Sequence, residues 1–545
     1  MAGIPAGSKN NPDDLPGDLA YLHAELRVLD LRLQRAVRLW QQAGQNPLDG
    51  FRGLSVSDAE ASALLNRPPG GNWGNTAALP AEEEQTFNQA YSLAEDNLRR
   101  LQEKLLSSGE IPRLMLLARA FRLDRFDLNI LLLALAPAID LRYERIFGYL
   151  QDDVTRKRPT VNLVFDLFGP TGLERVTCLH RFSDTAPLFR FHILELTAES
   201  HDARPGLLGS AFTADDGILR WLAGEPILSP RLKPAVIRME QQSAPVDRLL
   251  VGEKNWTALQ QFAVAIKDEP RPPMAVFTGR DSGVFQAAAR HCAMTMQRPL
   301  MVIDLAQLQA EPEDRLFLQR LALRDGLLNR ALLLFLGWDT WLARGAGTKA
   351  LVEEALAYPG FLMLASRNGW HPTGIARQRG IRQFDFPAPG FVQRQGLWHS
   401  ELGELFPAAD LTAVSGQFRL ISSQIRDAAA LLRDRAAQGV DLGAADLFSA
   451  ARTCSNPLLS NLARKITPHY TRADIILPAD QLALIGEIVD TVRNRSKVLE
   501  EWGLGRKLVS SSGVTTLFAG PPGTGKTMAA EIIASELGLD LYKID

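Results

Sequence analysis

The sequence predicts a multidomain chain. We expect an α-helical N-terminal region and a winged helix (α+β), then an α/β glycine-loop module with a helical lid, then the start of a second α/β module of the same kind. Three observations predict this order: helical periodicity leading into a helix-turn-helix pattern, a glycine-rich loop near the end of the chain, and a degenerate repeat of that loop in the middle. The length of 545 residues suits several domains of ordinary size.

The composition excludes some classes of protein. The formal net charge is -2, so there is no general basic excess that would favour nucleic acid or anionic membranes. The three scattered cysteines (Cys178, Cys292 and Cys454) cannot form a disulfide framework or a metal knuckle, which suits a reducing cytoplasm. The N-terminus lacks the apolar core of a signal peptide, and the apolar run at 130–139 is too short for a membrane span. We therefore expect a cytoplasmic protein without a membrane segment.

The first expected domain, residues 1–80, is a helical region followed by a linker. Leu22, Leu26, Leu29 and Leu33 have the spacing of one face of an amphipathic helix over 18–42. This helix packs on its own domain in one interpretation and docks a partner in the other. The stretch PPGGNWGNTAALP (68–80) is dense in Pro, Gly and Asn, which predicts a linker.

The second expected domain, residues 81–240, has a winged-helix pattern. A long helix at 81–106 precedes IPRLMLLARAFRLDRFDLNILLLALAPAID, which predicts a helix, a tight turn and a second helix with Asp124 as its N-cap. Strands are expected at 161–167 and 189–196. A helix-turn-helix followed by strands is typical of winged helices, which often read DNA.

Two features favour a structural or protein-docking role over DNA reading. The second helix is apolar almost all round, so we expect it to be buried, and its only candidate base contacts are Arg125 and Asn129. The only basic cluster is Arg156, Lys157 and Arg158. Nucleic acid is therefore not the expected partner.

A glycine-rich loop in the last expected domain, residues 456–545, carries the clearest chemistry. GPPGTGKT matches G-x-x-x-x-G-K-[ST], between an apolar run at 514–519 that predicts a strand and a predicted helix at 527–537. Glycines let several backbone N–H groups point at phosphate oxygens, and the helix N-terminus adds partial positive charge. The alternative is a plain Gly/Pro turn without a ligand.

The loop residues predict a site for ATP and Mg²⁺. Lys526 would reach the β- and γ-phosphates, and the Thr527 hydroxyl would hold Mg²⁺. The predicted contacts to ATP are Gly520, Pro521, Pro522, Gly523, Thr524, Gly525, Lys526, Thr527 and Met528.

The middle of the chain repeats the surroundings of this loop. MAVFTGRDSGVFQAAARHCAMTMQRPLMVIDL resembles TTLFAGPPGTGKTMAAEIIASELGLDLYKID, and each predicts a strand, a glycine loop, a helix and a strand ending in Ile-Asp. Val284, Phe285 and Gln286 stand in place of the Gly-Lys-Thr of the last domain. With Phe285 for the lysine, nothing neutralises a phosphate, and we expect the ring to fill the phosphate cavity. Residues 241–389 are therefore predicted to be a degenerate α/β subdomain.

Later segments complete this subdomain. ALLLFLGWD (331–339) predicts the strand that would carry a carboxylate pair, but it offers only Asp339, which we interpret as a capping or loop aspartate. A further strand is expected at 360–366, and a helical lid at 390–455. The spacing from Gly279 to Asp339, counted from Gly520, reaches beyond Asp545. The sequence therefore predicts that the chain is C-terminally truncated and that the catalytic residues of the last domain lie beyond Asp545.

These segments resemble a known family. GPPGTGKT, preceded by a helix and WGL (502–504), is similar to AAA+ ATPases. The whole pattern resembles a bacterial subfamily with a winged helix, a degenerate AAA module and a C-terminal active one. These ATPases are encoded with extracellular contractile injection systems, which are phage-tail-like particles. The segments LLLALAPAIDLRYERIFGYLQDDVTRKRPTV (131–161), LARKITPHYTRADIILP (462–478) and the final P-loop segment carry the resemblance.

The resemblance implies a function. In such a P-loop AAA+ module, Lys526 and Thr527 would bind the phosphates and Mg²⁺, and Ile475 and Ile476 would approach adenine. It also implies a ring of subunits with arginine fingers supplied by neighbours, and ATP hydrolysis that remodels or assembles a protein complex. Two alternatives remain: a nucleic-acid-directed ATPase that uses the winged helix, and a non-catalytic scaffold ordered by nucleotide.

Overall fold

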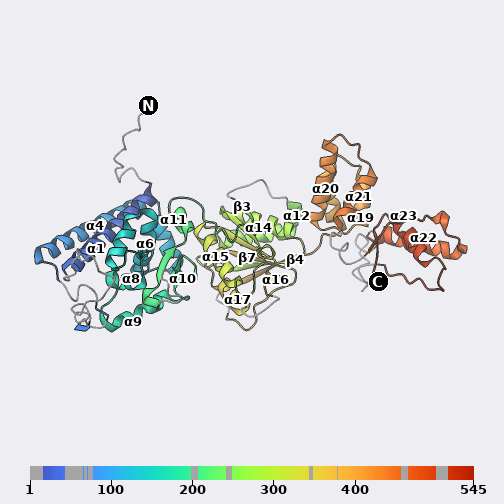
Figure 1. Cartoon of the computed structure of the whole chain (residues 1–545). Coiled ribbons are helices and arrows are strands. Elements are labelled where there is room, and N and C mark those ends of the chain that lie inside the picture. The colour runs from blue at the N-terminus through green and yellow to red at the C-terminus, as the bar shows by residue number, and fades with distance from the viewer. Residues whose placement is uncertain are drawn as a thin grey trace, which may run out of the picture. The chain divides into compact units, whose positions relative to one another are not determined.

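The structure is a computed structural model that describes residues 16–42, 65–66, 70–71, 78–197, 206–240, 248–342, 348–376, 379–455, 464–496, 498 and 514–544. The chain divides into two compact units (Figure 1), which are Met1–Pro234 with Ala310–Ala331 and Ala235–Gln309 with Leu332–Asp545. The fold class predicted from the sequence is confirmed, because a helical winged-helix unit precedes a unit built on a mostly parallel sheet.

Two long helices begin the first unit. α1 (Gly17–Gln42) and α4 (Ala81–Ser107) confirm the helices predicted at 18–42 and 81–106, and they pack against each other. α1 buries Leu22, Leu26, Leu29 and Leu33 in the core of its own unit. The apolar face of α1 therefore packs on its own domain. Most of the linker predicted at 68–80 lies outside the described residues.

The predicted helix-turn-helix is confirmed. α5 (Arg113–Phe121) ends at Arg122, whose φ of 54° is left-handed, and α6 (Arg125–Ile139) begins after Asp124. The Asp124 carboxylate accepts a hydrogen bond from Asp127 N at 3.0 Å, and the Asp127 carboxylate accepts one from Asp124 N at 3.2 Å. This reciprocal capping box fixes the start of the helix. Residues 130–136 are all buried, as the apolar sequence predicted.

The strand predicted at 161–167 is wrong, because these residues form helix α8 (Val161–Phe168). The Thr160 hydroxyl caps this helix by accepting a hydrogen bond from Leu163 N at 3.3 Å. Val161, Val164 and Phe165 are fully buried in the core of the unit. The two polar residues of α8, Asn162 and Asp166, are four positions apart and lie on one face of the helix. A run of eight mostly apolar residues is nevertheless compatible with either a buried strand or a short helix.

The strand predicted at 189–196 is also largely wrong. A proline at the first helical position starts the short helix α10 (Pro187–Arg190). Only β1 (Leu194–Thr197) is extended, and it pairs antiparallel with β2 (Ala211–Ala214) to form the small sheet of the wing. The other helical elements of this region are α7 (Arg142–Leu150), η2 (Gly172–Glu174), α9 (Arg175–Cys178), η3 (Leu179–Phe182), η4 (Leu207–Gly209) and α11 (Asp216–Leu222).

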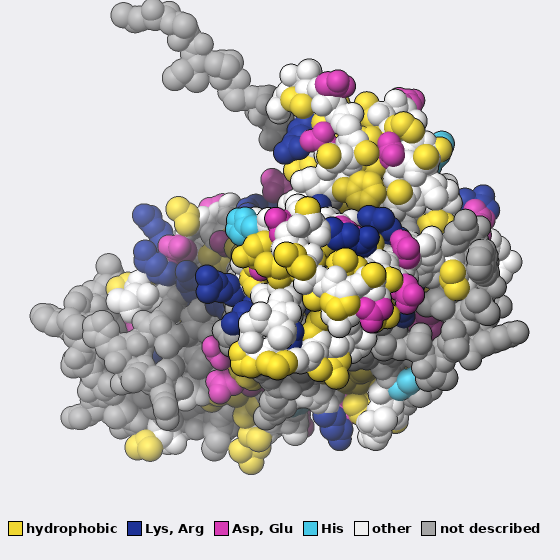
Figure 2. Space-filling model, turned by 90° about the vertical axis from the view of Figure 1, so that its right-hand side faces the viewer, with side chains coloured by type: hydrophobic (Ala, Val, Ile, Leu, Met, Phe, Trp, Pro, Cys, Tyr) yellow, Lys and Arg dark blue, Asp and Glu magenta, His cyan; other side chains and the backbone are white. Residues whose placement is uncertain are grey.

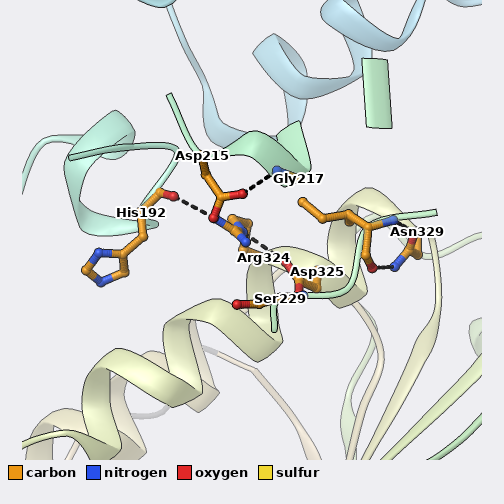
Figure 3. Close-up of polar contacts among 8 residues, drawn as sticks. His192, Asp215, Gly217, Ser229, Arg324, Asp325 and Asn329 are labelled. Carbon is orange, nitrogen blue, oxygen red and sulfur yellow. Dashed lines mark hydrogen bonds and ion pairs between the residues drawn. The ribbon is translucent and has the colours of Figure 1, made fainter. Parts of the chain in front are cut away.

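Helix α15 (Arg315–Leu328) belongs to the first unit, although the chain reaches it from the second. Its fully buried Arg324 donates from Nη1 to the His192 carbonyl at 2.6 Å and to Asp215 Oδ2 at 3.1 Å (Figure 3). The Arg324 Nε donates to Asp325 Oδ1 at 2.9 Å, and Asp325 Oδ2 accepts from Ser229 N at 2.7 Å. Buried charges persist in folded proteins when they are paired, so this network anchors α15 beside the wing.

A six-stranded sheet forms the centre of the second unit (Figure 1). Its strands lie in the order β3 (Val236–Glu240), β5 (Leu300–Asp304), β6 (Leu332–Leu336), β7 (Leu362–Ser366), β4 (Met274–Gly279) and β8 (Ile381–Phe386). All pairs are parallel except the one between β3 and β5. Consecutive residues of β4 to β7 are buried, as in parallel sheets covered on both faces. The strands predicted in the degenerate repeat are thus confirmed.

Helices surround this sheet. α14 (Ser282–Met296) follows β4 directly and shares one apolar core with α13 (Glu253–Ile266) and with alternate residues of the strands. β4 lies inside the sheet between β7 and β8, so the loop after Gly279 emerges where the strand order reverses. Ligands of open α/β sheets bind at such positions. The other helices of this region are α12 (Arg248–Val251), η5 (Leu305–Leu308), α16 (Trp338–Leu342) and α17 (Thr348–Ala357).

Four helices form the lid predicted at 390–455. They are α18 (Phe391–Leu402), α19 (Ala408–Gln417), α20 (Ser422–Ala437) and α21 (Ala444–Ser455). Leu397, Val414, Ile425 and Leu432 are fully buried in the same apolar core as the sheet. The lid and the α/β part of the degenerate module therefore share a core.

The second module is described in part. It contains β9 (Arg464–Ile466), η7 (Arg472–Asp474), α22 (Ala479–Ser496), α23 (Lys526–Leu537) and β10 (Leu541–Lys543). α23 confirms the helix predicted at 527–537, and β10 is a shorter strand than the one expected at 539–544. β10 pairs antiparallel with β9.

The strand predicted at 514–519 is wrong, since these residues form no regular secondary structure. A strand needs a neighbour for its backbone groups, and no described strand lies against this segment.

Figure 2 shows hydrophobic side chains gathered among charged ones on one face of the molecule. The large hydrophobic side chains of the second module that are exposed include Ile476, Leu484, Leu517 and Ile544.

Across the parts of the chain that the structure describes, no helix combines the length and the apolar character that crossing a bilayer requires.

Candidate functional site

The glycine-rich loop between residue 520 and α23 has a backbone that only glycine adopts readily. Gly520, Gly523 and Gly525 have φ values of 155°, 84° and 84°. Residues with a β-carbon rarely take these conformations. The three glycines of the motif therefore allow the backbone of the loop to curl. The loop leads directly into the first residue of α23, Lys526.

The side chain of Lys526 folds back over this loop. Its Nζ donates to Gly520 O at 2.9 Å and to Pro521 O at 2.6 Å. The Thr524 hydroxyl donates to Pro521 O at 3.0 Å, which tightens the same turn. The ammonium group thus lies over the loop, next to the positive end of the α23 dipole.

The start of α23 offers further donors. Gly525 caps this helix without a side-chain hydrogen bond, and the first N–H groups of a helix have no partner within it. The Thr527 side chain is exposed at this point, and Met528 packs against the small core of the module. Pro521, Pro522 and Gly523 are exposed along the loop. The structure therefore brings the predicted loop contacts together around one helix N-terminus.

The two isoleucines implied by the family resemblance are placed differently. Ile475 is buried in a core with Ile485, Ala529 and Ile532, and a β-carbon at position 525 would lie 3.7 Å from its Cδ1. Ile476 is 97% exposed. Ile475 therefore lies beside the loop, while Ile476 is free to meet a ligand from the segment before α22.

This set of groups fits ATP and Mg²⁺. Phosphate oxygens are bound by backbone N–H groups at a helix N-terminus and by a lysine ammonium, and both are present here. Mg²⁺ takes oxygen ligands in an octahedron and keeps several waters, so the exposed Thr527 hydroxyl suits one position in its shell. Thr527 is the candidate metal residue.

The nearby carboxylates of the second module have other partners. Glu531 Oε2 accepts from His469 N at 3.2 Å, and Glu536 Oε1 lies 2.8 Å from Arg472 Nε. Asp540 Oδ2 pairs with Lys465 Nζ at 3.0 Å. These contacts hold α23 and β10 in place.

The loop at the corresponding position of the first module has a different structure. Only Arg280 and Asp281 separate Gly279 from α14, and Gly279 has a φ of 157°, close to that of Gly520. Phe285 is 5% exposed, and its ring lies 5.8 Å from that of Phe386 and 6.2 Å from that of Phe277. An aromatic cluster therefore occupies the position that lysine takes in the second module.

Asp281 is a residue of this loop that the motif comparison missed. Its Oδ1 accepts from Gly283 N at 3.0 Å and from Val284 N at 3.4 Å, which caps α14, and its Oδ2 accepts from Ser423 N in the lid at 3.0 Å. An aspartate just before a helix is a recognisable N-cap signal. The contact with Ser423 has no such signal, because it joins residues 142 positions apart.

A cavity of about 490 Å³ lies beside this loop. Its lining includes Gly252, Arg280, Asp281, Phe384 and Ser422, so it lies between the start of α13, the loop, the end of β8 and the lid. Asp281 and the aromatic cluster border it where the second module would receive phosphates. The predicted loop aspartate Asp339 lies apart, in the first turn of α16.

The winged helix offers little to a DNA base. Arg125, one of its two candidate base contacts, pairs through Nη1 with Glu25 Oε2 at 2.7 Å, and the Glu25 carboxylate is buried. The other candidate, Asn129, is half-buried on α6. Arg125 is therefore part of the contact between α6 and α1.

Three family models match the chain. The winged helix domain (variant) matches residues 16–236, and the contractile injection system ATPase helical domain matches residues 391–457. The ATPase family associated with various cellular activities (AAA) matches residues 516–545.

Two known proteins are similar to parts of the chain. The uncharacterized AAA family ATPase y4kL of Sinorhizobium fredii is 35% identical over 85 residues, which are 16% of this chain and 24% of that relative. The match thus spans about a quarter of the length of the curated relative. The crystal structure of the FIGL-1 AAA domain is 14% identical in sequence with a TM-score of 0.30, and the match covers 41% of this chain and 87% of that chain.

The AAA match covers the segment that holds the glycine loop and α23, so this segment is similar to AAA family ATPases. The match to the helical domain of contractile injection system ATPases follows the winged-helix match and precedes the AAA match along the chain. The resemblance predicted from the sequence is confirmed. The finer domain boundaries and the individual ATP contacts remain predictions.

Proposed function

We propose that this protein binds ATP and Mg²⁺ at loop 520–527 and that it belongs to an ATPase that hydrolyses ATP to remodel or assemble a protein complex. The observation that carries the proposal is the position of Lys526 Nζ, 2.9 Å from Gly520 O and 2.6 Å from Pro521 O at the start of α23. A phosphate above the loop would offer this ammonium group stronger, charge-assisted hydrogen bonds than two neutral carbonyls do.

Each residue of the loop has a task in this proposal. The glycines expose backbone N–H groups to the β- and γ-phosphates, Lys526 neutralises phosphate charge, and Thr527 places an oxygen on Mg²⁺. Mg²⁺ held there would supply positive charge that offsets the charge of the phosphates. Ile475 and Ile476 approach the adenine ring, Ile475 through its place beside Gly525.

The polypeptide of residues 1–545 is proposed to bind ATP without turning it over. Phosphoryl transfer also needs a metal-holding carboxylate, a residue that orients water and an arginine near the transferred group. Glu531, Glu536 and Asp540 of the described second module have other partners. The residues that complete the reaction are unassigned.

The proposed partners follow from the helical domain and the AAA segment. ATPases of this class act as assemblies, so we propose that the subunits form a ring and that the client is a protein, with a contractile injection system as the candidate. Nucleic acid is not the proposed partner. The proposed location is the cytoplasm. The formal net charge of the chain is -2, and its sequence has only three cysteines, which suits a reducing compartment.

Titration calorimetry with Mg·ATP on the 545-residue chain tests the site. We expect Lys526→Ala to lower the affinity by about 100-fold or more, because two charge-assisted contacts are worth roughly 1.5–3 kcal/mol each. Lys465→Ala is the matched control, since it removes a lysine of the same module that pairs with Asp540 away from the loop. Unchanged affinity in Lys526→Ala, or equal losses in both variants, would contradict the assignment.

A further inference from the structure

The first module holds a carboxylate where the second module is built to receive a phosphate. α14 and α23 follow equivalent glycines, Gly279 and Gly520, whose φ values are 157° and 155°. α23 begins without a side-chain cap, so its first N–H groups remain for a ligand. α14 begins behind Asp281, whose Oδ1 accepts from Gly283 N at 3.0 Å and from Val284 N at 3.4 Å. Two of the first N–H donors of α14, those of Gly283 and Val284, are thus already used.

The same carboxylate also reaches the lid. Asp281 Oδ2 accepts from Ser423 N at 3.0 Å, and Ser423 is the second residue of α20. One aspartate therefore caps two helices, and both helix dipoles present their positive ends to it. Asp281 is only 6% exposed, so its carboxylate is largely shielded from water. The N–H groups of the two helix ends supply the hydrogen bonds that a buried charge needs.

The surroundings of Asp281 disfavour a triphosphate at the loop, although a cavity of about 490 Å³ lies beside it. Phe285 fills the lysine position in contact with Phe386, and a phosphate brought to the loop would meet the negative charge of Asp281. The loop is also shorter, with two residues before α14 compared with the five residues 521–525 before α23. The charge of Asp281, the absence of a lysine and the length of the loop all oppose nucleotide at this position.

The lid packs tightly against the loop as well. A β-carbon at Gly283 would lie 3.4 Å from Ser423 Cβ and 3.2 Å from Asp281 Oδ1. Ile425 and Ala428 of α20 are fully buried in the core that α14 shares. The start of α20 is therefore fixed to the loop by both apolar packing and the hydrogen bond from Ser423 N.

We propose that Asp281 is an internal substitute for a nucleotide phosphate, which joins α14 to α20 and keeps the lid of the first module on its α/β core without nucleotide. The first module is then a fixed structural part of the protein. This inference does not depend on ATP binding at Lys526, because every contact that carries it lies within residues 279–428.

Hydrogen–deuterium exchange of the 545-residue chain tests the proposal at the first turn of α20. We expect Asp281→Ala to speed exchange there by roughly 10- to 100-fold, because a hydrogen bond to a charged group is worth about 1.5–3 kcal/mol. Asp304→Ala is the matched control. Asp304 also caps a helical turn, with Oδ1 accepting from Ala306 N at 3.0 Å, but that turn is η5. Exchange in α20 that is the same in Asp281→Ala and the wild type would overturn the proposal.

Two further exchange measurements complete the test. Asp281→Asn serves if Asp281→Ala unfolds the whole sheet, because asparagine keeps the shape of the side chain. We expect Asp281→Asn to speed exchange at α20 while β4 to β7 stay protected. Exchange at the wild-type rate in this variant would overturn the proposal.

In Lys526→Ala, Mg·ATP should leave the exchange of α20 unchanged. Protection of α20 by Mg·ATP in that variant would show that nucleotide holds the lid and would also contradict the proposal.

Discussion

Two equivalent positions, 526 and 285, distinguish the loop that we propose to bind ATP from the corresponding loop of the first module. The lysine ammonium lies over the carbonyls of its own loop, whereas the phenylalanine ring is buried against Phe386. A charged donor can exchange its neutral acceptors for phosphate oxygens. A buried ring offers no donor and cannot leave its cavity without exposing apolar surface.

His192 gives a pH dependence at the residue scale. Burial, together with the charges of Arg324, Arg320 and Arg231, lowers the pKa of its imidazole from 6.5 to about 4, against an opposing effect of Asp184. The unfolded chain therefore binds more protons than the folded one between about pH 6.5 and 4. The stabilisation is fully present above pH 6.5 and is lost as the pH falls toward 4. We expect the urea midpoint of the winged-helix unit to fall over this range.

The contribution of His192 can be isolated by comparing slopes. In His192→Gln, the urea midpoint should fall less steeply with decreasing pH, since the titrating group is gone. His23→Gln should keep the slope of the wild type, because His23 is an exposed residue of α1. Equal slopes for the wild type and His192→Gln would contradict the assignment, whatever the absolute stability of the variant.

Residues that act through local chemistry were predictable from the sequence. Asp124 is confirmed as the N-cap of α6, because this role depends on neighbours a few positions away. The fixed spacing of the motif likewise predicts roles for Lys526 and Thr527, which remain predictions. The second partner of Asp281 and the contact of Arg324 with Asp215 were not predictable, since both join residues more than 100 positions apart.

At the scale of elements, periodicity decided which predictions held. α1 and α4 have a polar and an apolar side, and both were predicted with nearly correct ends. α8 is only eight residues long and mostly apolar, and the strand predicted there is wrong. The stretch 514–519 has the sequence of a buried strand but no described neighbour to pair with. A short apolar run does not distinguish a helix from a strand, and strand pairing is a tertiary property that a local pattern does not contain.

The contact between α1 and α6 predicts a stability effect. Arg125 pairs with Glu25, whose carboxylate is buried and also accepts from Tyr21 Oη at 3.2 Å. We expect Arg125→Ala to lower the free energy of unfolding by roughly 1–3 kcal/mol in urea denaturation, because it leaves a buried carboxylate with too few partners. The Arg125 end of the pair is partly exposed, so solvent screening favours the lower part of this range.

Arg99→Ala provides the control for this variant. Arg99 is an exposed residue of α4 whose pair with Asp96 is also exposed, and such pairs contribute about 0–1 kcal/mol. If Arg125 instead reads DNA, Arg125→Ala will leave stability unchanged and abolish the gel shift of a defined duplex at near-physiological salt. That outcome would restore the nucleic-acid alternative.

At the scale of the whole molecule, the two units are interleaved in sequence. The chain leaves the second unit after Gln309, contributes α15 to the first unit and returns at Leu332. The buried network of Arg324 and Asp325 holds α15 beside the wing (Figure 3). Domains drawn as consecutive stretches of sequence cannot describe this arrangement. Helix α15 belongs to the first unit, but along the chain it lies between β5 and β6, two strands of the sheet of the second unit.

We infer that the chain has one loop that binds nucleotide and one whose helix N-terminus is occupied by a side chain of the protein itself. The number of Mg·ATP molecules bound per 545-residue chain, measured by titration calorimetry, tests this inference. We expect one ATP per chain in the wild type and still one in Phe285→Lys, because the new lysine would face a loop whose donors remain bound to Asp281. Two ATP molecules per chain in either protein would contradict the account.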